Sequence, residues 1–149
     1  MIWKPHVTVA AVIERDGKFL FVEEHTDFGL QFNQPAGHLE AREDFLTAVK
    51  REVYEETAWQ FEPESLLSVQ LWQRDTNSPT YLRFCFTGQC HSHEPNKTLD
   101  EGIVAAHWLS YQELLERRER LRSPLVLTSV EHYLSGTRYP LEILKSFYE

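Results

Sequence analysis

Five stretches of apolar, β-branched and aromatic positions predict strands, at residues 6–14, 17–24, 65–73, 80–90 and 103–110. The first two flank Arg15-Asp16-Gly17 and the third and fourth flank residues 75–79, so each pair is expected to form a hairpin. Residues 25–36 are expected to be a loop. In the fourth stretch Leu82, Phe84 and Phe86 share one face, so Arg83 is expected to project away from the apolar side.

Three other stretches have helical signals. A helix is expected from about Asp44 to Thr57, with Asp44 as its N-cap. Ser110 can cap a short helix, and Ser123 followed by Pro124 predicts a last helix that Gly136 would close. Strands mixed with separated helices predict an α+β fold, and 149 residues fit one domain, 1–149.

The helix at 44–57 places acidic residues where apolar ones should be. At about 100° per residue, Glu52 and Glu56 fall on either side of Phe45, within the face that should meet the core, and Glu55 lies at its edge near Ala48. Carboxylates spaced i, i+3 and i+4 also repel one another, close to the negative end of the helix dipole. Such a cluster requires protons, cationic partners or a metal ion.

Hard oxygen ligands at this density suit Mg²⁺ or Mn²⁺. The alternative is a solvated acidic face on which Lys50 and Arg51 form ion pairs, as most charge runs do. The helix alone leaves both interpretations open.

The formal net charge of -8 disfavours nucleic acid and anionic membranes as partners, because both would be repelled. No apolar stretch approaches the roughly 20 residues that span a bilayer, and residues 1–9 have no secretory pattern. We therefore expect a cytoplasmic protein that recruits a cation if its ligand is anionic.

The segment from Gly37 to Trp59 resembles the Nudix box, G-x5-E-x7-R-E-U-x-E-E-x-G-U, where U is a bulky aliphatic residue. The matching positions are Gly37, Glu43, Arg51, Glu52, Val53, Glu55 and Glu56. Two positions depart: Ala58 replaces a glycine expected in the left-handed region, at a cost of about 1 kcal/mol, and Trp59 replaces the aliphatic residue. Both lie beyond the carboxylates.

Further segments resemble the NudJ-type phosphatase branch of this family. They are residues 6–10, 33–40, 82–84, 121–126 and 138–142, which together touch most of the chain. The resemblance implies the Nudix fold, a mixed curved β-sheet sandwiched between α-helices. It also implies Mg²⁺-dependent hydrolysis of phosphoanhydride bonds in nucleoside tri- and diphosphates and in thiamine-related pyrimidine diphosphates.

The resemblance also implies roles for the box residues. Glu55 and Glu56 correspond to the principal metal ligands, Glu52 to a further ligand or the base for the attacking water, and the Gly37 carbonyl to an additional ligand. Arg51 would orient the glutamates, with Glu43 as its structural partner. On the helical wheel, however, Arg51 lies on the outer face and would have to reach around the helix.

Other candidates lie outside the box. Arg83 could grip a substrate phosphate with its planar guanidinium, or form a salt bridge at the rim. Gln34 and Tyr81 are further substrate-binding candidates, and Tyr81 could stack on a ring or simply pack in the core. Asp100 and Glu101 could reach the metal or supply a base, although loop carboxylates are mostly solvated.

Two other functions fit the same residues. One is a Nudix-fold module that senses a nucleotide without cleaving it, although a sensor has no need of the complete glutamate set. The other is an enzyme for dinucleoside polyphosphates or nucleotide sugars. In each case the partner is a small phosphorylated molecule, and the chain could be a monomer or a small homo-oligomer.

Overall fold

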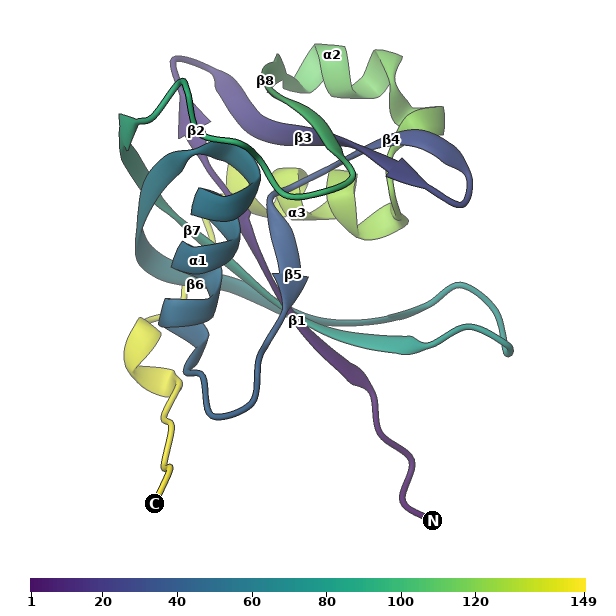
Figure 1. Ribbon diagram of the computed structural model, residues 1–149, viewed down its shortest axis with the longest axis vertical. Coiled ribbons are helices and arrows are strands. Elements are labelled where there is room, and N and C mark those ends of the chain that lie inside the picture. The colour runs from purple at the N-terminus through teal and green to yellow at the C-terminus, as the bar shows by residue number, and fades with distance from the viewer.

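The computed structural model describes residues 1–149 and contains eight strands, three α-helices and two 3-10 turns (Figure 1). The strands are β1 (His6–Val12), β2 (Glu14–Arg15), β3 (Lys18–Thr26), β4 (Gly29–Asn33), β5 (Ala36–His38), β6 (Trp59–Gln73), β7 (Thr80–His93) and β8 (Ile103–Ser110). The helices are α1 (Phe45–Thr57), α2 (Tyr111–Glu116) and α3 (Pro124–Leu134), with 3-10 turns at η1 (Arg118–Arg120) and η2 (Leu141–Ile143).

The strands form two four-stranded sheets. The first has the order β5-β1-β7-β6, in which β1 and β7 are parallel and the other pairs antiparallel. In the second, β3 pairs with β2, β4 and β8, all antiparallel. The α+β class and the mixed sheet are thus confirmed, with the strands divided between two sheets.

The predicted first hairpin is wrong for most of its length. Only β2 turns back on β3 through Asp16 and Gly17, which both have positive φ values, while β1 runs into the other sheet and pairs with β7. Residues 9–13 are buried throughout, as expected for a strand covered on both faces. The predicted loop at 25–36 is also wrong, because β4 and the start of β5 lie within it.

The other elements follow their sequence signals closely. Asp44 caps α1 by accepting a hydrogen bond from the Thr47 N–H at 2.8 Å, and Ala58 ends the helix with a φ of 64°. Ser110 forms a capping box on α2, and Ser123 and Pro124 begin α3. The hairpin of β6 and β7 is longer than predicted and extends away from the rest of the molecule (Figure 1).

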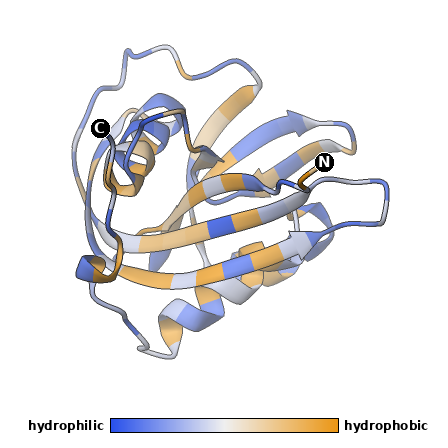
Figure 2. Cartoon of the chain, turned by 90° about the horizontal axis from the view of Figure 1, so that it is seen from below, coloured by the Kyte–Doolittle hydropathy of each residue, from blue (hydrophilic) through white to orange (hydrophobic).

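The first sheet has a hydrophobic core on each face. On one face Val9 and Phe86 pack with Val49 and Val53 of α1, and on the other face Ala10 and Cys85 pack with residues of α3. Alternate residues of β1 and β7 therefore enter different cores. In Figure 2 apolar residues concentrate on the strands, whereas the connecting loops are mainly hydrophilic.

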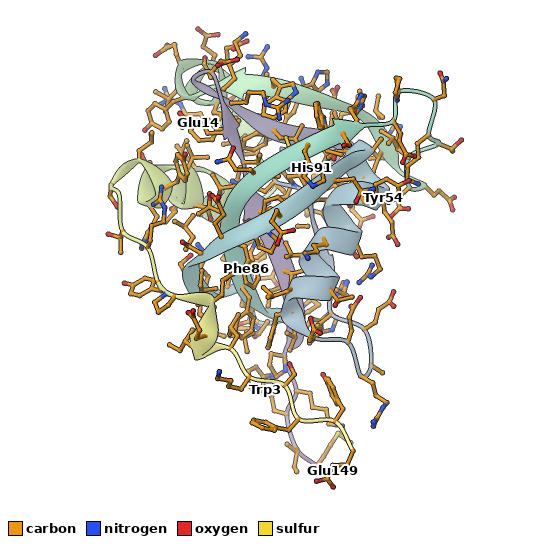
Figure 3. The ribbon with its side chains drawn as sticks, turned by 90° about the vertical axis from the view of Figure 1, so that its left-hand side faces the viewer. Trp3, Glu14, Tyr54, Phe86, His91 and Glu149 are labelled. Carbon is orange, nitrogen blue, oxygen red and sulfur yellow. The ribbon has the colours of Figure 1, made fainter.

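Both ends of the chain lie at one end of the molecule, where Figure 3 shows Trp3 and Glu149 away from the packed layers that contain Phe86. The carboxy-terminal segment contacts the start of α1, because Tyr148 donates to the Glu43 carbonyl at 2.8 Å and Arg42 to the Glu149 carbonyl at 2.7 Å. None of the helices is long and apolar enough to cross a membrane.

Candidate active site

The acidic residues of α1 lie where the helical wheel predicted. Glu52 and Glu56 are buried on the same face as Ala48, Val49 and Val53. They point toward β5, the edge strand of the first sheet. Glu56 accepts the Ala36 N–H at 2.9 Å, and a Cβ atom on Gly37 would overlap the Glu52 carboxylate. The absence of a side chain at position 37 therefore makes room for Glu52.

Asp100 completes a cluster with two of these glutamates. One oxygen from each of Glu52, Glu55 and Asp100 lies within 4.8 Å of the others. The loop before β8 is held there because the Asp100 N–H donates to the Glu55 carbonyl at 3.0 Å. Glu56 and Glu101 are outside this group, and Glu101 is exposed.

Arg51 does reach around the helix. Its guanidinium donates to both oxygens of Glu43, at 2.7 and 2.9 Å, to Glu52 at 2.7 Å, to Glu55 at 3.4 Å and to the His38 carbonyl at 3.1 Å. These bonds lower the pKa of Glu43 and raise that of Arg51. Arg51 and Glu43 therefore connect the loop before α1, strand β5 and the glutamates, as their box positions imply.

The buried carboxylates resist ionisation. Burial raises the pKa of Glu56 to about 9, although the Ala36 N–H opposes the shift, and Glu52 and Glu24 add repulsion. Burial also raises the pKa of Glu52 to about 7, against the opposing effect of Arg51. Burial and Asp100 raise the pKa of Glu55. A divalent cation would favour the charged forms, and an all-carboxylate donor set fits Mg²⁺ or Mn²⁺.

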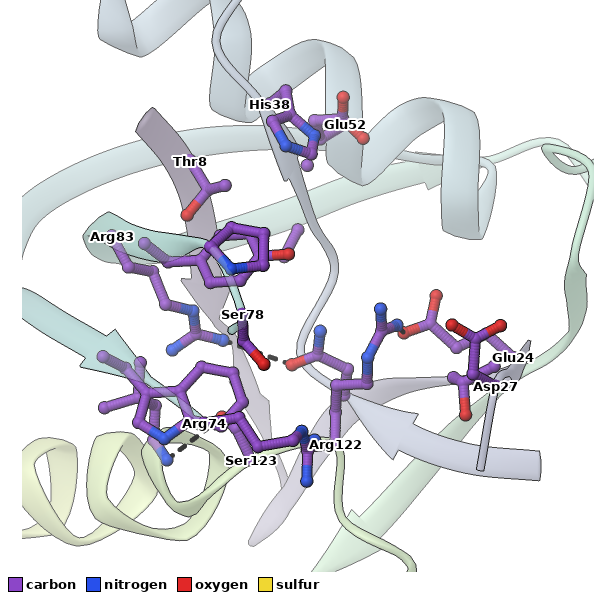
Figure 4. A pocket seen from close by; sticks show the side chains of 18 of the residues that line it. Thr8, Glu24, Asp27, His38, Glu52, Arg74, Ser78, Arg83, Arg122 and Ser123 are labelled. Atoms are coloured by element: carbon purple, nitrogen blue, oxygen red, sulfur yellow. Dashed lines mark hydrogen bonds and ion pairs between the residues drawn. The ribbon is translucent and has the colours of Figure 1, made fainter. Parts of the chain in front are cut away.

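A cavity of about 670 Å³ adjoins the glutamates, which is large enough for a small-molecule ligand. Glu52, Glu56 and Gly37 line one part of it. Figure 4 shows Glu52 and His38 at one end, Arg74 and Arg122 at the opposite end, and Arg83 along the wall between them.

The register of the first sheet explains which side chains line the cavity. Paired residues of neighbouring strands project to the same side. One row runs across all four strands through His38, Thr8, Arg83 and Gln70. The next row contains His6, Tyr81 and Trp72, in which the rings of Trp72 and Tyr81 are stacked with centroids 6.0 Å apart. Tyr81 lines the cavity.

Arg83 is buried and forms no salt bridge, so the interpretation as a rim ion pair is wrong. Its side chain does point away from Leu82, Phe84 and Phe86, but that side is covered as well, by α3. Gln34 is 1% exposed and does not line the cavity. Its oxygen accepts from Arg83 at 2.8 Å and its nitrogen donates to the Val126 carbonyl at 2.8 Å. In this structure Gln34 therefore orients Arg83.

Several cavity residues lie outside the candidates named above. Thr8 and His38 could have been found from the alternation of β1 and from their place beside the box. Glu24 and Arg122 form an ion pair whose two members are nearly 100 positions apart, which no local pattern reveals. Arg74 lies 4.4 Å from the Phe28 ring and 5.2 Å from the Trp72 ring, so it links the β3–β4 turn to the β6–β7 hairpin.

Comparison with known proteins agrees with this geometry. The NUDIX domain family matches residues 4–128, and the chain therefore belongs to the Nudix family. It is 42% identical to Phosphatase NudJ of Escherichia coli K12 over 146 residues, which are 98% of this chain and 94% of that protein. Phosphatase NudJ of Shigella flexneri matches equally well.

A solved NUDIX hydrolase from Nitrosomonas europaea is 48% identical, with a TM-score of 0.93 over 97% of this chain and 98% of that one. The MutT NUDIX hydrolase from Burkholderia pseudomallei is 23% identical with a TM-score of 0.75, over 87% of this chain and 98% of that one, and shows the shared fold. The chain is thus a Nudix hydrolase similar to the NudJ phosphatases, which confirms the resemblance seen in its sequence.

Proposed function

We propose that the protein hydrolyses phosphoanhydride bonds of small diphosphate compounds with the help of Mg²⁺. The substrate classes are nucleoside tri- and diphosphates and thiamine-related pyrimidine diphosphates. The observation that carries the proposal is the approach of Glu52, Glu55 and Asp100 to within 4.8 Å beside the cavity. The similarity to NudJ phosphatases supports a phosphatase activity, and the substrate classes are those that the sequence resemblance implies.

The residues that would hold the cation are Glu52, Glu55, Glu56 and Asp100, with the Gly37 carbonyl as a further oxygen. Glu56 remains a proposed ligand although its oxygens lie outside the 4.8 Å group. When bound, the ion would neutralise charge on the phosphate oxygens and lower the pKa of an attacking water. Mn²⁺ has similar ligand preferences and is the alternative cation.

Other residues of the chain position these groups. Arg51 holds Glu52 and Glu55 through its guanidinium and is itself held by Glu43. Glu52 lies in the cluster and lines the cavity, so it is the candidate to accept a proton from water, in place of or in addition to a ligand role. Tyr81, stacked on Trp72, provides a flat surface on which a substrate ring can lie.

A phosphate-release assay tests the proposal directly. The panel would contain nucleoside tri- and diphosphates, thiamine diphosphate, a dinucleoside polyphosphate and a nucleotide sugar, each with Mg²⁺ and with EDTA. We expect Mg²⁺-dependent release of orthophosphate or pyrophosphate from the first two classes. Turnover of only the last two would contradict the substrate assignment, and no turnover of any compound would favour the sensor.

Two variants with the same change of charge make the assay specific. Glu55→Gln alters the carboxylate cluster, whereas Glu62→Gln alters an exposed glutamate whose partner is Lys50 at 3.5 Å on the surface. We expect Glu55→Gln to lose most of its turnover and Glu62→Gln to keep it. Equal rates in the two variants would contradict the role of the cluster.

A further inference from the structure

Arg83 is a buried cation with no anionic partner. Its side chain is 6% exposed, yet no carboxylate lies within salt-bridge distance. The terminal nitrogens instead donate to four neutral oxygens, on Gln70, Ser129, Asn33 and Gln34, at 2.8 to 3.2 Å. Burial lowers the pKa of Arg83, but an arginine remains charged at neutral pH.

A buried charge without a counter-charge is costly, and it is usually paired. The four neutral acceptors satisfy hydrogen bonds and leave the positive charge uncompensated. They also fix the plane of the guanidinium from three directions. Gln70 is on β6, Ser129 is on α3, Asn33 is the last residue of β4, and Gln34 follows it. The Nε–H takes part in none of these four bonds.

The cavity beside Arg83 contains both arginines and carboxylates, which include Asp27 and Asp75 as well as the glutamates. Arg74 and Arg122 line the same cavity, and Arg74 has no carboxylate partner either. Ser123, the N-cap of the eleven-residue helix α3, is a further lining residue, so the positive end of the helix dipole faces the cavity. Arg122 differs from the other two arginines, because Glu24 balances its charge.

We propose that Arg83 binds a phosphate group of the substrate that the carboxylate cluster does not hold. The substrate then lies along the cavity with its phosphates between two sites of opposite kind, the carboxylates of α1 and the guanidinium of Arg83. Arg83 thereby selects for compounds that carry an anionic group at this position. The inference rests on the proposed function, because it assigns part of the same cavity.

Nuclear magnetic resonance can detect the anion without hydrolysis. The Arg83 Nε–H signal of ¹⁵N-labelled protein in EDTA can be assigned, because it is the signal that is missing from the spectrum of Arg83→Lys. We expect inorganic phosphate to shift this signal in a saturable manner, and sodium chloride at the same ionic strength not to shift it. No saturable shift, or the same shift with chloride, would overturn the proposal.

Two methionine variants then compare the same loss of charge at two places. Arg15 is exposed, donates to the Cys90 carbonyl at 2.7 Å and does not line the cavity. Phosphate binding can be followed through the backbone amide signals of cavity residues such as Ser123. We expect phosphate to bind about tenfold more weakly to Arg83→Met and with unchanged affinity to Arg15→Met. Equal weakening in both variants would show that only the overall charge matters and would overturn the proposal.

Kinetics supply a readout that a structural role would not move. With Mg²⁺ and a diphosphate that the unmodified protein cleaves, Arg83→Lys should raise KM more than it lowers kcat, because lysine keeps the charge and loses the Nε–H and the fixed planar guanidinium. Arg83→Lys also serves where Arg83→Met fails to fold. The phosphate titration requires no turnover, so a protein that binds phosphate at Arg83 and hydrolyses nothing would contradict the proposed function alone.

Discussion

Gly37 and Glu52 share one small space: a Cβ atom at position 37 would overlap the Glu52 carboxylate. Gly37 does not have a positive φ, so its backbone conformation is open to other residues. The box glycine is therefore required here for space. Its absent side chain lets a buried carboxylate from α1 lie against β5 at the edge of the sheet.

Replacing Gly37 with alanine should displace Glu52. We predict that Gly37→Ala loses most of the Mg²⁺-dependent turnover and that the double variant Gly37→Ala/Glu52→Gln is hardly slower than either single variant, since both changes act on one carboxylate. The four kcat/KM values would be compared in a double-mutant cycle. Independent, multiplying losses would show that Gly37 acts through another group.

The pH dependence of stability should reveal the buried Glu56. Because its pKa is raised to about 9 from an ordinary 4.5, the folded protein holds a proton that the unfolded chain has lost. In EDTA, the Glu56 contribution to the free energy of unfolding should therefore be intact below 4.5 and decline as the pH rises toward 9. Urea unfolding of the protein and of Glu56→Gln across this range measures the difference.

Glu56→Gln should flatten that decline and still lose turnover by orders of magnitude, because an amide needs no proton but is a poor substitute for an anionic ligand. A variant with the same pH profile as the unmodified protein would remove Glu56 as the source of the decline. An unchanged rate of hydrolysis would remove its proposed role as a ligand.

Arg51 should tolerate little change. Lysine in its place keeps one positive charge but cannot donate to Glu43, Glu52 and the His38 carbonyl at once. We predict that Arg51→Lys lowers kcat more than tenfold, because one or two charge-assisted hydrogen bonds are lost, each of about 1.5–3 kcal/mol. Calorimetric Mg²⁺ affinity should fall in parallel, and an unaffected affinity would contradict the orienting role.

Replacing Ala58 with glycine should change the free energy of unfolding only a little. Relief of its left-handed conformation would gain about 1–2 kcal/mol, but Ala58 is only 2% exposed and its buried methyl group contributes about 0.8 kcal/mol. We therefore predict that Ala58→Gly raises the free energy of unfolding by about 1 kcal/mol or less. A loss of stability in urea titrations would mean that packing outweighs backbone strain.

The parts of the structure that the sequence predicted are those with local causes. Helix α1 begins directly after its N-cap Asp44 and buries Glu52 and Glu56 because capping and periodicity act within a few residues. Strands β4 and β5 were missed because short strands depend on distant partners, here β3 and β1. Periodicity alone likewise could not show that β1 leaves its expected hairpin for β7.

The same distinction applies to the site. Glu52 and Glu55 meet where their spacing implies, whereas Asp100 joins them only because its N–H is bonded to the end of α1. Arg83 was placed on the correct face of its strand, but its burial depends on α3, more than 40 residues later in the chain. Long-range packing thus determines which polar side chains line the cavity.

Calorimetric titration of the metal-free protein with Mg²⁺, in the presence of a nonhydrolysable nucleotide, tests the role of the carboxylate cluster most directly. We predict saturable binding that Glu55→Gln weakens strongly and Glu62→Gln leaves unchanged, with protons released on binding because Glu52 and Glu56 must ionise. Absence of Mg²⁺ and Mn²⁺ binding at neutral pH, or equal binding by Glu55→Gln, would contradict a metal-dependent active site at α1.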